Sequence, residues 1–153
     1  MTNDNKIKNF EKFSGNYITS LRGFPLFISV AVIIYLMINA TQLSFFEKFI
    51  FFVPIIAFYF GAGSEAYYFL VSPTQLVIKN QLFWWVNKTY ELRNIDKVSL
   101  ISATRQHSKA LSINTKDSKS KKYPAGSLRK HTWKEIQNKF ESFGIKVQNE
   151  FTF

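Results

Sequence analysis

Two long apolar stretches follow one another in the first half of the chain. The first covers residues 24–40 and the second covers residues 49–68. Each approaches the length of about 20 residues with which a helix crosses a bilayer core of about 30 Å. The pattern predicts two transmembrane helices, at about 23–40 and 48–70, joined by a short external loop. The alternative is a buried hairpin in a soluble protein, which would need a larger domain to cover so much Phe and Ile.

The pattern changes after residue 72, where short runs of β-branched and aromatic residues alternate with polar turns. Such runs are typical of strands bounded by turn residues. The sequence predicts a small antiparallel sheet with strands at 76–78, 82–86, 89–92, 98–104, 110–115 and 121–123, and a last short strand at 145–147.

One amphipathic helix is predicted near the C-terminus. Thr132 and Glu135 have the spacing of a capping box, with Thr132 as the N-cap. Gly144 stands where a glycine commonly ends a helix. The helix then presents one apolar stripe for packing on the sheet, made of Trp133, Ile136, Phe140 and Phe143.

These elements predict a membrane α+β protein. A cytosolic leader (1–22) precedes the transmembrane hairpin (23–71), and a cytosolic basic ligand-binding domain (72–153) follows it. The leader carries four basic residues against two acidic ones, and 15 basic against 6 acidic residues lie from Lys79 onward. Basic flanks stay in the cytosol, so both termini are expected there.

The second apolar stretch carries polar and small residues that suggest a role beyond anchoring. Ala57, Gly61 and Glu65 lie four residues apart and would share one helix face. One interpretation is that Glu65 pairs with Arg22 within the hairpin. The other is that this face meets further subunits and reopens as a polar path, with Pro54 as a kink.

The residues needed for familiar catalysis are missing. The chain has two histidines and no cysteine, so neither a zinc site nor thiol chemistry is indicated. It also lacks the phosphate-loop and nucleophile-elbow motifs. We therefore expect a protein that is not an enzyme and that has neither metal nor cofactor.

Basic residues of the predicted head point to an anionic ligand. The helix N-terminus near residues 129–131 suits phosphate, because its free N–H groups carry partial positive charge. The candidate ligand contacts are Arg105, His107, Lys109, Lys121, Lys122, Arg129, Lys130 and His131. Candidate surfaces for base stacking are Trp84, Trp85 and Tyr123. Two alternatives stay open, a basic face against anionic lipid and a merely solvated basic face.

The order of strands and a C-terminal helix after two apolar helices resembles small bacterial membrane proteins with a PH-like domain. The whole layout, with Arg105-Gln106-His107 and Lys121-Lys122-Tyr123, also resembles the small two-helix membrane effectors of type III CRISPR systems. That resemblance implies a homotetramer in the bacterial inner membrane that binds the second messenger cyclic tetra-adenylate and then perturbs the bilayer in antiviral defence. The alternative function is an envelope or immunity protein that binds lipid headgroups or a protein partner.

Overall fold

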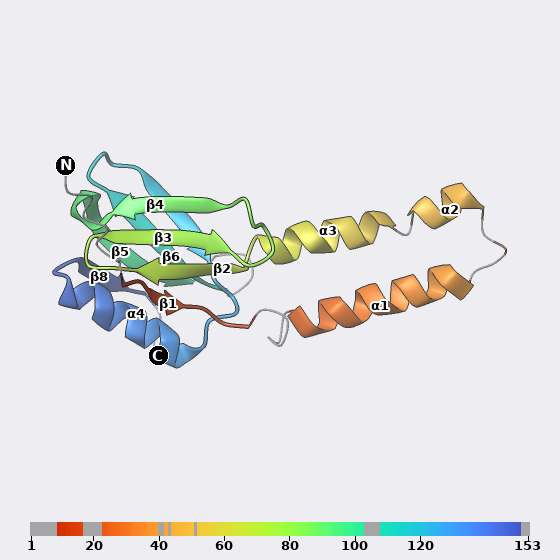
Figure 1. Cartoon of the computed structure of the whole chain (residues 1–153), viewed down its shortest axis with the longest axis horizontal. Coiled ribbons are helices and arrows are strands. Elements are labelled where there is room, and N and C mark those ends of the chain that lie inside the picture. Colours follow the sequence, from red (N-terminus) through yellow and green to blue (C-terminus); the bar gives the residue numbers. More distant parts are fainter. Residues whose placement is uncertain are drawn as a thin grey trace, which may run out of the picture.

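The computed structural model of the 153-residue chain describes residues 9–16, 23–39, 42, 44–50, 52–102 and 108–150. Two sheets of four strands and the helix α4 (Lys130–Ser142) form a head. A hairpin of helices projects from one end of this head (Figure 1).

The first sheet contains strands from the leader and from the middle of the chain. Its antiparallel order is β1 (Glu11–Phe13), β2 (Tyr67–Val71), β3 (Gln75–Asn80) and β4 (Asn87–Glu91). Leader residues therefore belong to the head, and the whole hairpin is inserted between the paired strands β1 and β2.

The second sheet has the order β7 (Ser120–Pro124), β6 (Lys109–Thr115), β5 (Ile95–Ser102) and β8 (Lys146–Asn149). A short 3₁₀ helix (Leu92–Asn94) leads into it from β4. The neighbours β5 and β8 are parallel, because α4 crosses over between β7 and β8. The prediction of one antiparallel sheet is therefore wrong on both the number of sheets and the strand direction.

The core lies between the two sheets and α4. In the first sheet, every second side chain of a strand points into this core, as Leu76 and Ile78 of β3 do. The second sheet contributes Leu100, Leu111 and Ile113, and all five side chains are fully buried. The same cluster includes the apolar stripe of α4, so one core holds both sheets and the helix.

The helix α4 confirms the predicted apolar stripe and its end. Trp133, Ile136 and Phe140 are fully buried. Gly144 has a φ of +74°, its N–H bonds to the carbonyl of Glu141, and the next N–H bonds to that of Phe140. This is a Schellman ending, which favours glycine. The predicted N-cap is wrong, because the helix begins at Lys130 with Arg129 in the N-cap position.

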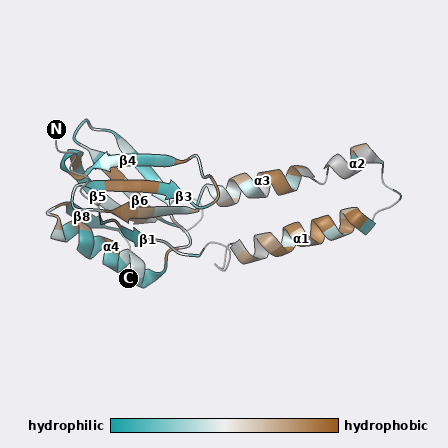
Figure 2. Cartoon of the chain, in the orientation of Figure 1, coloured by the Kyte–Doolittle hydropathy of each residue, from teal (hydrophilic) through white to brown (hydrophobic). Residues whose placement is uncertain are grey.

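The hairpin consists of α1 (Gly23–Asn39), α2 (Phe45–Ile50) and α3 (Phe52–Gly63). Figure 2 shows apolar residues along both α1 and α3, and many of these apolar side chains are exposed. The hairpin is joined to the head where the Tyr59 hydroxyl donates to the Leu82 carbonyl at 2.9 Å.

The prediction of a transmembrane hairpin is wrong for the part of the chain that the structure describes. No helix there combines the length and the apolar character needed to span a bilayer. The helix α1 has 17 residues, which gives a length of about 26 Å at 1.5 Å per residue. The second apolar stretch contains two shorter helices, α2 with 6 residues and α3 with 12. The same finding contradicts the predicted location in the inner membrane, which required two membrane-spanning helices.

Two further local predictions differ from the structure. The second apolar stretch was expected to stay helical to residue 70, but α3 ends at Gly63 and β2 begins at Tyr67. Residues 82–86 were expected to form a strand and instead form a loop between β3 and β4. The apolar run before residue 70 fits a helix or a buried strand equally well, and tertiary pairing makes its last residues a strand.

Candidate functional site

An open cavity of about 740 Å³ lies where the outer face of the first sheet meets the loop after β3. We call it the β1–β3 pocket. Its lining combines cations, amides, a hydroxyl, a glycine and two aromatic rings, contributed by Lys12, Ser14, Gly15, Asn16, Tyr68, Lys79, Asn80, Gln81 and Trp84.

Strand pairing brings the pocket's lysines together around Tyr68. Tyr68 pairs directly with Lys79, and Lys12 pairs with Leu70, two residues along β2. Phe69 of β2 points into the core, so Tyr68 and its partners lie on the opposite face of the sheet. The Lys12 Nζ lies 5.2 Å from the centre of the Tyr68 ring, within the range of a cation–π interaction.

The loop that completes the pocket is held by Asn80, whose side chain is 5% exposed. Its Oδ1 accepts hydrogen bonds from the N–H groups of Leu82 and Phe83, both at 2.9 Å. Its Nδ2 donates to the carbonyl of Gly63 at 2.5 Å. One buried side chain therefore shapes the loop and ties it to the end of α3.

The opposite wall depends on Gly15. The Gln81 Nε2 donates to the Gly15 carbonyl at 2.6 Å. A Cβ on Gly15 would lie only 1.9 Å from the carbonyl oxygen of Ser127. Any other residue would force this segment away from the turn before α4, so glycine lets this wall of the pocket lie against that turn.

The charge of the pocket is positive because its lysines have no acidic partner among the described residues. The ion pairs there are Arg93 with Glu91 at 2.7 Å and Lys139 with Glu11 at 2.6 Å. Neither includes Lys12 or Lys79, and the described residues that line the cavity include no acidic side chain. An anion entering the pocket would meet two ammonium groups without displacing a carboxylate.

The two predicted stacking tryptophans both lie in the loop. Trp84 is 84% exposed and lines the pocket. Trp85 is 56% exposed and stacks on Phe83, with ring centres 5.2 Å apart and planes 24° apart. Trp84 and Trp85 form a T-shaped pair with ring centres 5.9 Å apart, and the high exposure of Trp84 leaves ring surface open to a planar ligand.

The third stacking candidate, Tyr123, is only 6% exposed and belongs to the core. Its hydroxyl shares a hydrogen bond of 2.5 Å with that of Tyr90. Burial, followed by this hydrogen bond, raises the pKa of Tyr123. The ring therefore offers no free face for a base.

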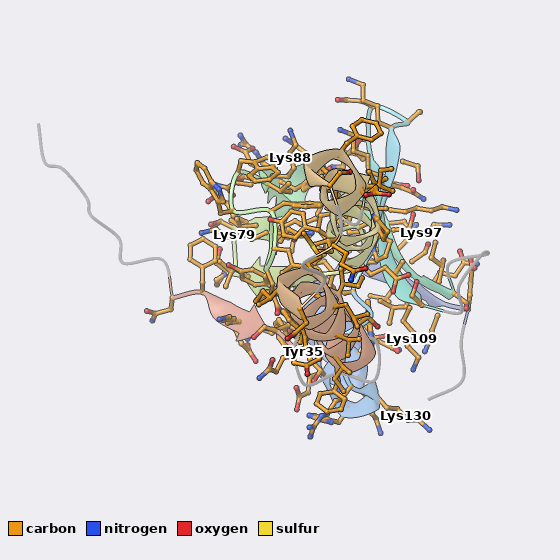
Figure 3. The ribbon with its side chains drawn as sticks, turned by 90° about the vertical axis from the view of Figure 1, so that its right-hand side faces the viewer. Tyr35, Lys79, Lys88, Lys97, Lys109 and Lys130 are labelled. Carbon is orange, nitrogen blue, oxygen red and sulfur yellow. The ribbon has the colours of Figure 1, made fainter. Side chains whose placement is uncertain are left out.

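The predicted basic contacts do not form one site in the described structure. Arg105 and His107 lie outside the described residues. Lys109 and Lys130 lie on one side of the head, away from Lys79 (Figure 3). Burial, and then the charge of Lys130, lowers the pKa of Lys109. Arg129 and His131 are exposed beside Lys130 at the start of α4.

The remaining basic candidates lie on the edge strand β7. Lys121 and Lys122 are both exposed and point to opposite faces of the strand. Lys121 lines a second cavity of about 310 Å³, together with Lys119 and the acidic residues Glu91 and Asp117. This cavity has mixed charge, so it favours an anion less than the β1–β3 pocket does.

The residues predicted to couple through the hairpin are dispersed. Arg22 lies outside the described residues. Pro54 lies in the first turn of α3, where a proline causes no kink. Ala57 and Gly61 are exposed. Glu65 lies beyond the helix end and is buried, with its carbonyl accepting from the N–H of Gly126 at 3.0 Å.

Sequence reasoning missed most of the pocket. Of its lining residues only Trp84 was a candidate. One signal was available, because alternation along β2 and β3 puts Tyr68 and Lys79 on the strand faces opposite the buried residues. No pattern in the sequence indicated that Lys12 would join them. No group of three or more His, Asp or Glu side chains able to hold a metal occurs among the described residues.

No protein-family profile matches the chain, and a search of curated proteins finds no match.

Proposed function

We propose that the chain is a non-enzymatic receptor that binds a nucleotide in the β1–β3 pocket, and that its ligand is a cyclic oligoadenylate such as cyclic tetra-adenylate. One observation carries this proposal: two lysines without an acidic partner among the described residues line the same cavity as two aromatic rings. Ammonium groups attract phosphate oxygens, and nucleobases stack on aromatic side chains. A nucleotide presents both features at a distance that one pocket can span.

The amides of the pocket support an adenine base. Asn and Gln side chains can donate to and accept from the edge of adenine at the same time. Asn16 brings such a group to the cavity wall, whereas the Gln81 Nε2 already donates to the Gly15 carbonyl, and the exposed ring of Trp84 lies at the rim. In this arrangement Lys12 and Lys79 hold the phosphates, Trp84 stacks on the base, and the Asn16 amide reads its edge.

The size of the cavity favours one part of a cyclic ligand. A volume of about 740 Å³ falls within the usual range of about 300–1000 Å³ for small-molecule sites. A ring of four nucleotides exceeds one such pocket, whereas four copies arranged by rotational symmetry would each take one nucleotide unit. A homotetramer around the ring therefore belongs to the proposal. The role in antiviral defence rests on the family resemblance.

The test is a binding titration of the full chain with fluorescent cyclic tetra-adenylate. Linear tetra-adenylate, a cyclic dinucleotide and inorganic tripolyphosphate serve as competitors. We expect Lys79→Ala to weaken binding by about 10- to 100-fold, since a hydrogen bond to a charged group contributes about 1.5–3 kcal/mol. Lys88→Ala is the matched control, because Lys88 is exposed on the neighbouring strand and does not line the cavity.

Equal losses in both variants, or equal binding of all four polyanions, would contradict the nucleotide proposal. A second candidate, a lipid headgroup phosphate, has one observation in its favour: the exposed Trp84 and Trp85 beside the pocket lysines. Tryptophan suits such polar–apolar boundaries. Vesicles containing anionic lipid would then displace the fluorescent probe, whereas vesicles of phosphatidylcholine alone would not.

A further inference from the structure

The cavity of about 310 Å³ beside β7 opens where the two sheets end next to each other. We call it the β4–β7 cavity. β4 and β7 are edge strands of their sheets, and the hydroxyls of Tyr90 and Tyr123 join them by a hydrogen bond of 2.5 Å. Thr89, Tyr90 and Glu91 are consecutive residues of β4, and all three line the cavity. Because the side chains of a strand alternate between its faces, such a lining indicates that the cavity follows the backbone edge of β4.

Charged side chains of opposite sign line this cavity without forming ion pairs with one another. Glu91 is already engaged, because its Oε2 lies 2.7 Å from the Nε of Arg93. Asp117, Lys119 and Lys121 line the cavity and are exposed. They belong to neither of the ion pairs named above for the described residues. One carboxylate and two ammonium groups are therefore open to the charges of a ligand.

The lining also has an apolar part. Ile113 is 1% exposed, so it lies at the bottom of the cavity, and the partly buried ring of Tyr90 lines the same space. The volume stands at the lower end of the usual range of about 300–1000 Å³ for small-molecule sites. The cavity therefore suits a small molecule that carries both charges and an apolar group.

The turn between β6 and β7 carries Asp117 and Lys119 in a fixed backbone conformation. Ser118 has a φ of 59°, in the left-handed region that few residues other than glycine adopt. Its N–H bonds to the Thr115 carbonyl at 2.9 Å, and the Thr115 N–H bonds to the Lys119 carbonyl at 3.0 Å. Such conformations persist where the surroundings hold them, and they cluster at ligand sites. The turn therefore fixes the backbone of the cavity rim before a ligand arrives.

We propose that the β4–β7 cavity binds a free amino acid with an apolar side chain. The α-ammonium group of the ligand binds the Asp117 carboxylate, and its carboxylate binds Lys119 and Lys121, through charge-assisted hydrogen bonds. The apolar side chain packs on Ile113 and the Tyr90 ring. A zwitterion uses both signs of charge in the lining, whereas a polyanion would be repelled by Asp117. This site is separate from the β1–β3 pocket, and the inference does not rest on the nucleotide proposal.

Isothermal titration of the full chain with leucine tests this inference. Two analogues serve as comparisons, isocaproate, which lacks the ammonium group, and isoamylamine, which lacks the carboxylate. We expect leucine to bind at least about 10-fold more tightly than either analogue, because each one loses hydrogen bonds to a charged group. Isocaproate that binds as tightly as leucine would overturn the inference, since the cavity would then recognise only an anion. So would the absence of binding by leucine, valine and phenylalanine alike.

Matched variants locate the binding. Asp117→Asn and Lys121→Met should each weaken leucine binding by about 10-fold. Asp96→Asn and Lys122→Met are the controls, because they make the same changes at exposed positions that do not line the cavity. Lys79→Ala, in the β1–β3 pocket, should also leave leucine binding unchanged. Equal losses in the cavity variants and their controls would overturn the inference, since leucine would then respond to net charge rather than to this site.

Discussion

At the residue scale, two glycines of α3 differ in how much space surrounds them. A Cβ on Gly63 would lie 2.1 Å from the ring of Phe83, whereas a Cβ on Gly61 would meet nothing within 4 Å. Gly63 also supplies the carbonyl that Asn80 binds. The absence of a side chain at Gly63 therefore lets the pocket loop lie against the end of α3.

We predict opposite effects of Gly61→Ala and Gly63→Ala on stability. Alanine at position 61 should raise the free energy of unfolding by about 0.5–1 kcal/mol, since it stiffens the unfolded chain and favours the helix. Alanine at position 63 should lower it by about 1–3 kcal/mol, because the Phe83 ring must move. Urea denaturation of both variants measures the difference, and equal effects would contradict the close packing of Phe83 on Gly63.

At the element scale, α4 is the piece that joins the two sheets into one core. Its Trp133 ring lies 6.1 Å from that of Phe69 in the first sheet, and its chain continues into β8 of the second sheet. The ion pair between Lys139 and Glu11 links it to β1 at the surface. Exposed pairs of this kind contribute about 0.2–1 kcal/mol, so burial holds the helix in place.

Phe140→Ala should therefore lower the free energy of unfolding by about 3–5 kcal/mol, because it removes a fully buried ring and leaves a cavity. Phe143→Ala serves as the comparison, since that ring is only partly buried at the edge of the core. Its cost should be clearly smaller. Thermal unfolding followed by circular dichroism would give both values, and similar losses would argue against α4 as the central packing element.

At the scale of the whole molecule, the chain combines a strongly basic head with an apolar arm whose two longer helices carry no charge. The formal net charge is +10, and the hairpin helices α1 and α3 contribute none of it. Asn80 and Tyr59 connect the arm to the pocket loop by hydrogen bonds. A ligand that repositions this loop would act on the base of α3 directly.

The basic head leads to a prediction about salt. Affinity for any polyanion should fall as ionic strength rises, because the Debye length shortens from about 10 Å at 0.1 M to about 3 Å at 1 M. For a nucleotide in the β1–β3 pocket, preference for the cyclic tetramer over tripolyphosphate should increase with salt, since stacking on Trp84 is not screened. Titrations at several salt concentrations would test this, and a preference that vanishes with salt would indicate purely electrostatic attraction.

The sequence by itself determined the features that depend on nearby residues. The stripe of α4 and its ending at Gly144 follow from side-chain spacing within one helix and from the φ that only glycine adopts easily. The alternation of β3 and the apolar character of α1 could likewise be read locally. These features are decided by contacts a few residues apart.

Only the tertiary structure decided the strand pairing and the candidate site. Residues 67–71 and 11–13 become strands because they pair with each other, and residues 67–71 also pair with β3. The first segment ends an apolar run typical of a helix, and the second lies in a polar leader. The same pairing carries Lys12 across more than 50 residues of sequence to Tyr68 and Lys79. Hydrogen bonds between distant strands create the pocket, and no local pattern records which strands will meet.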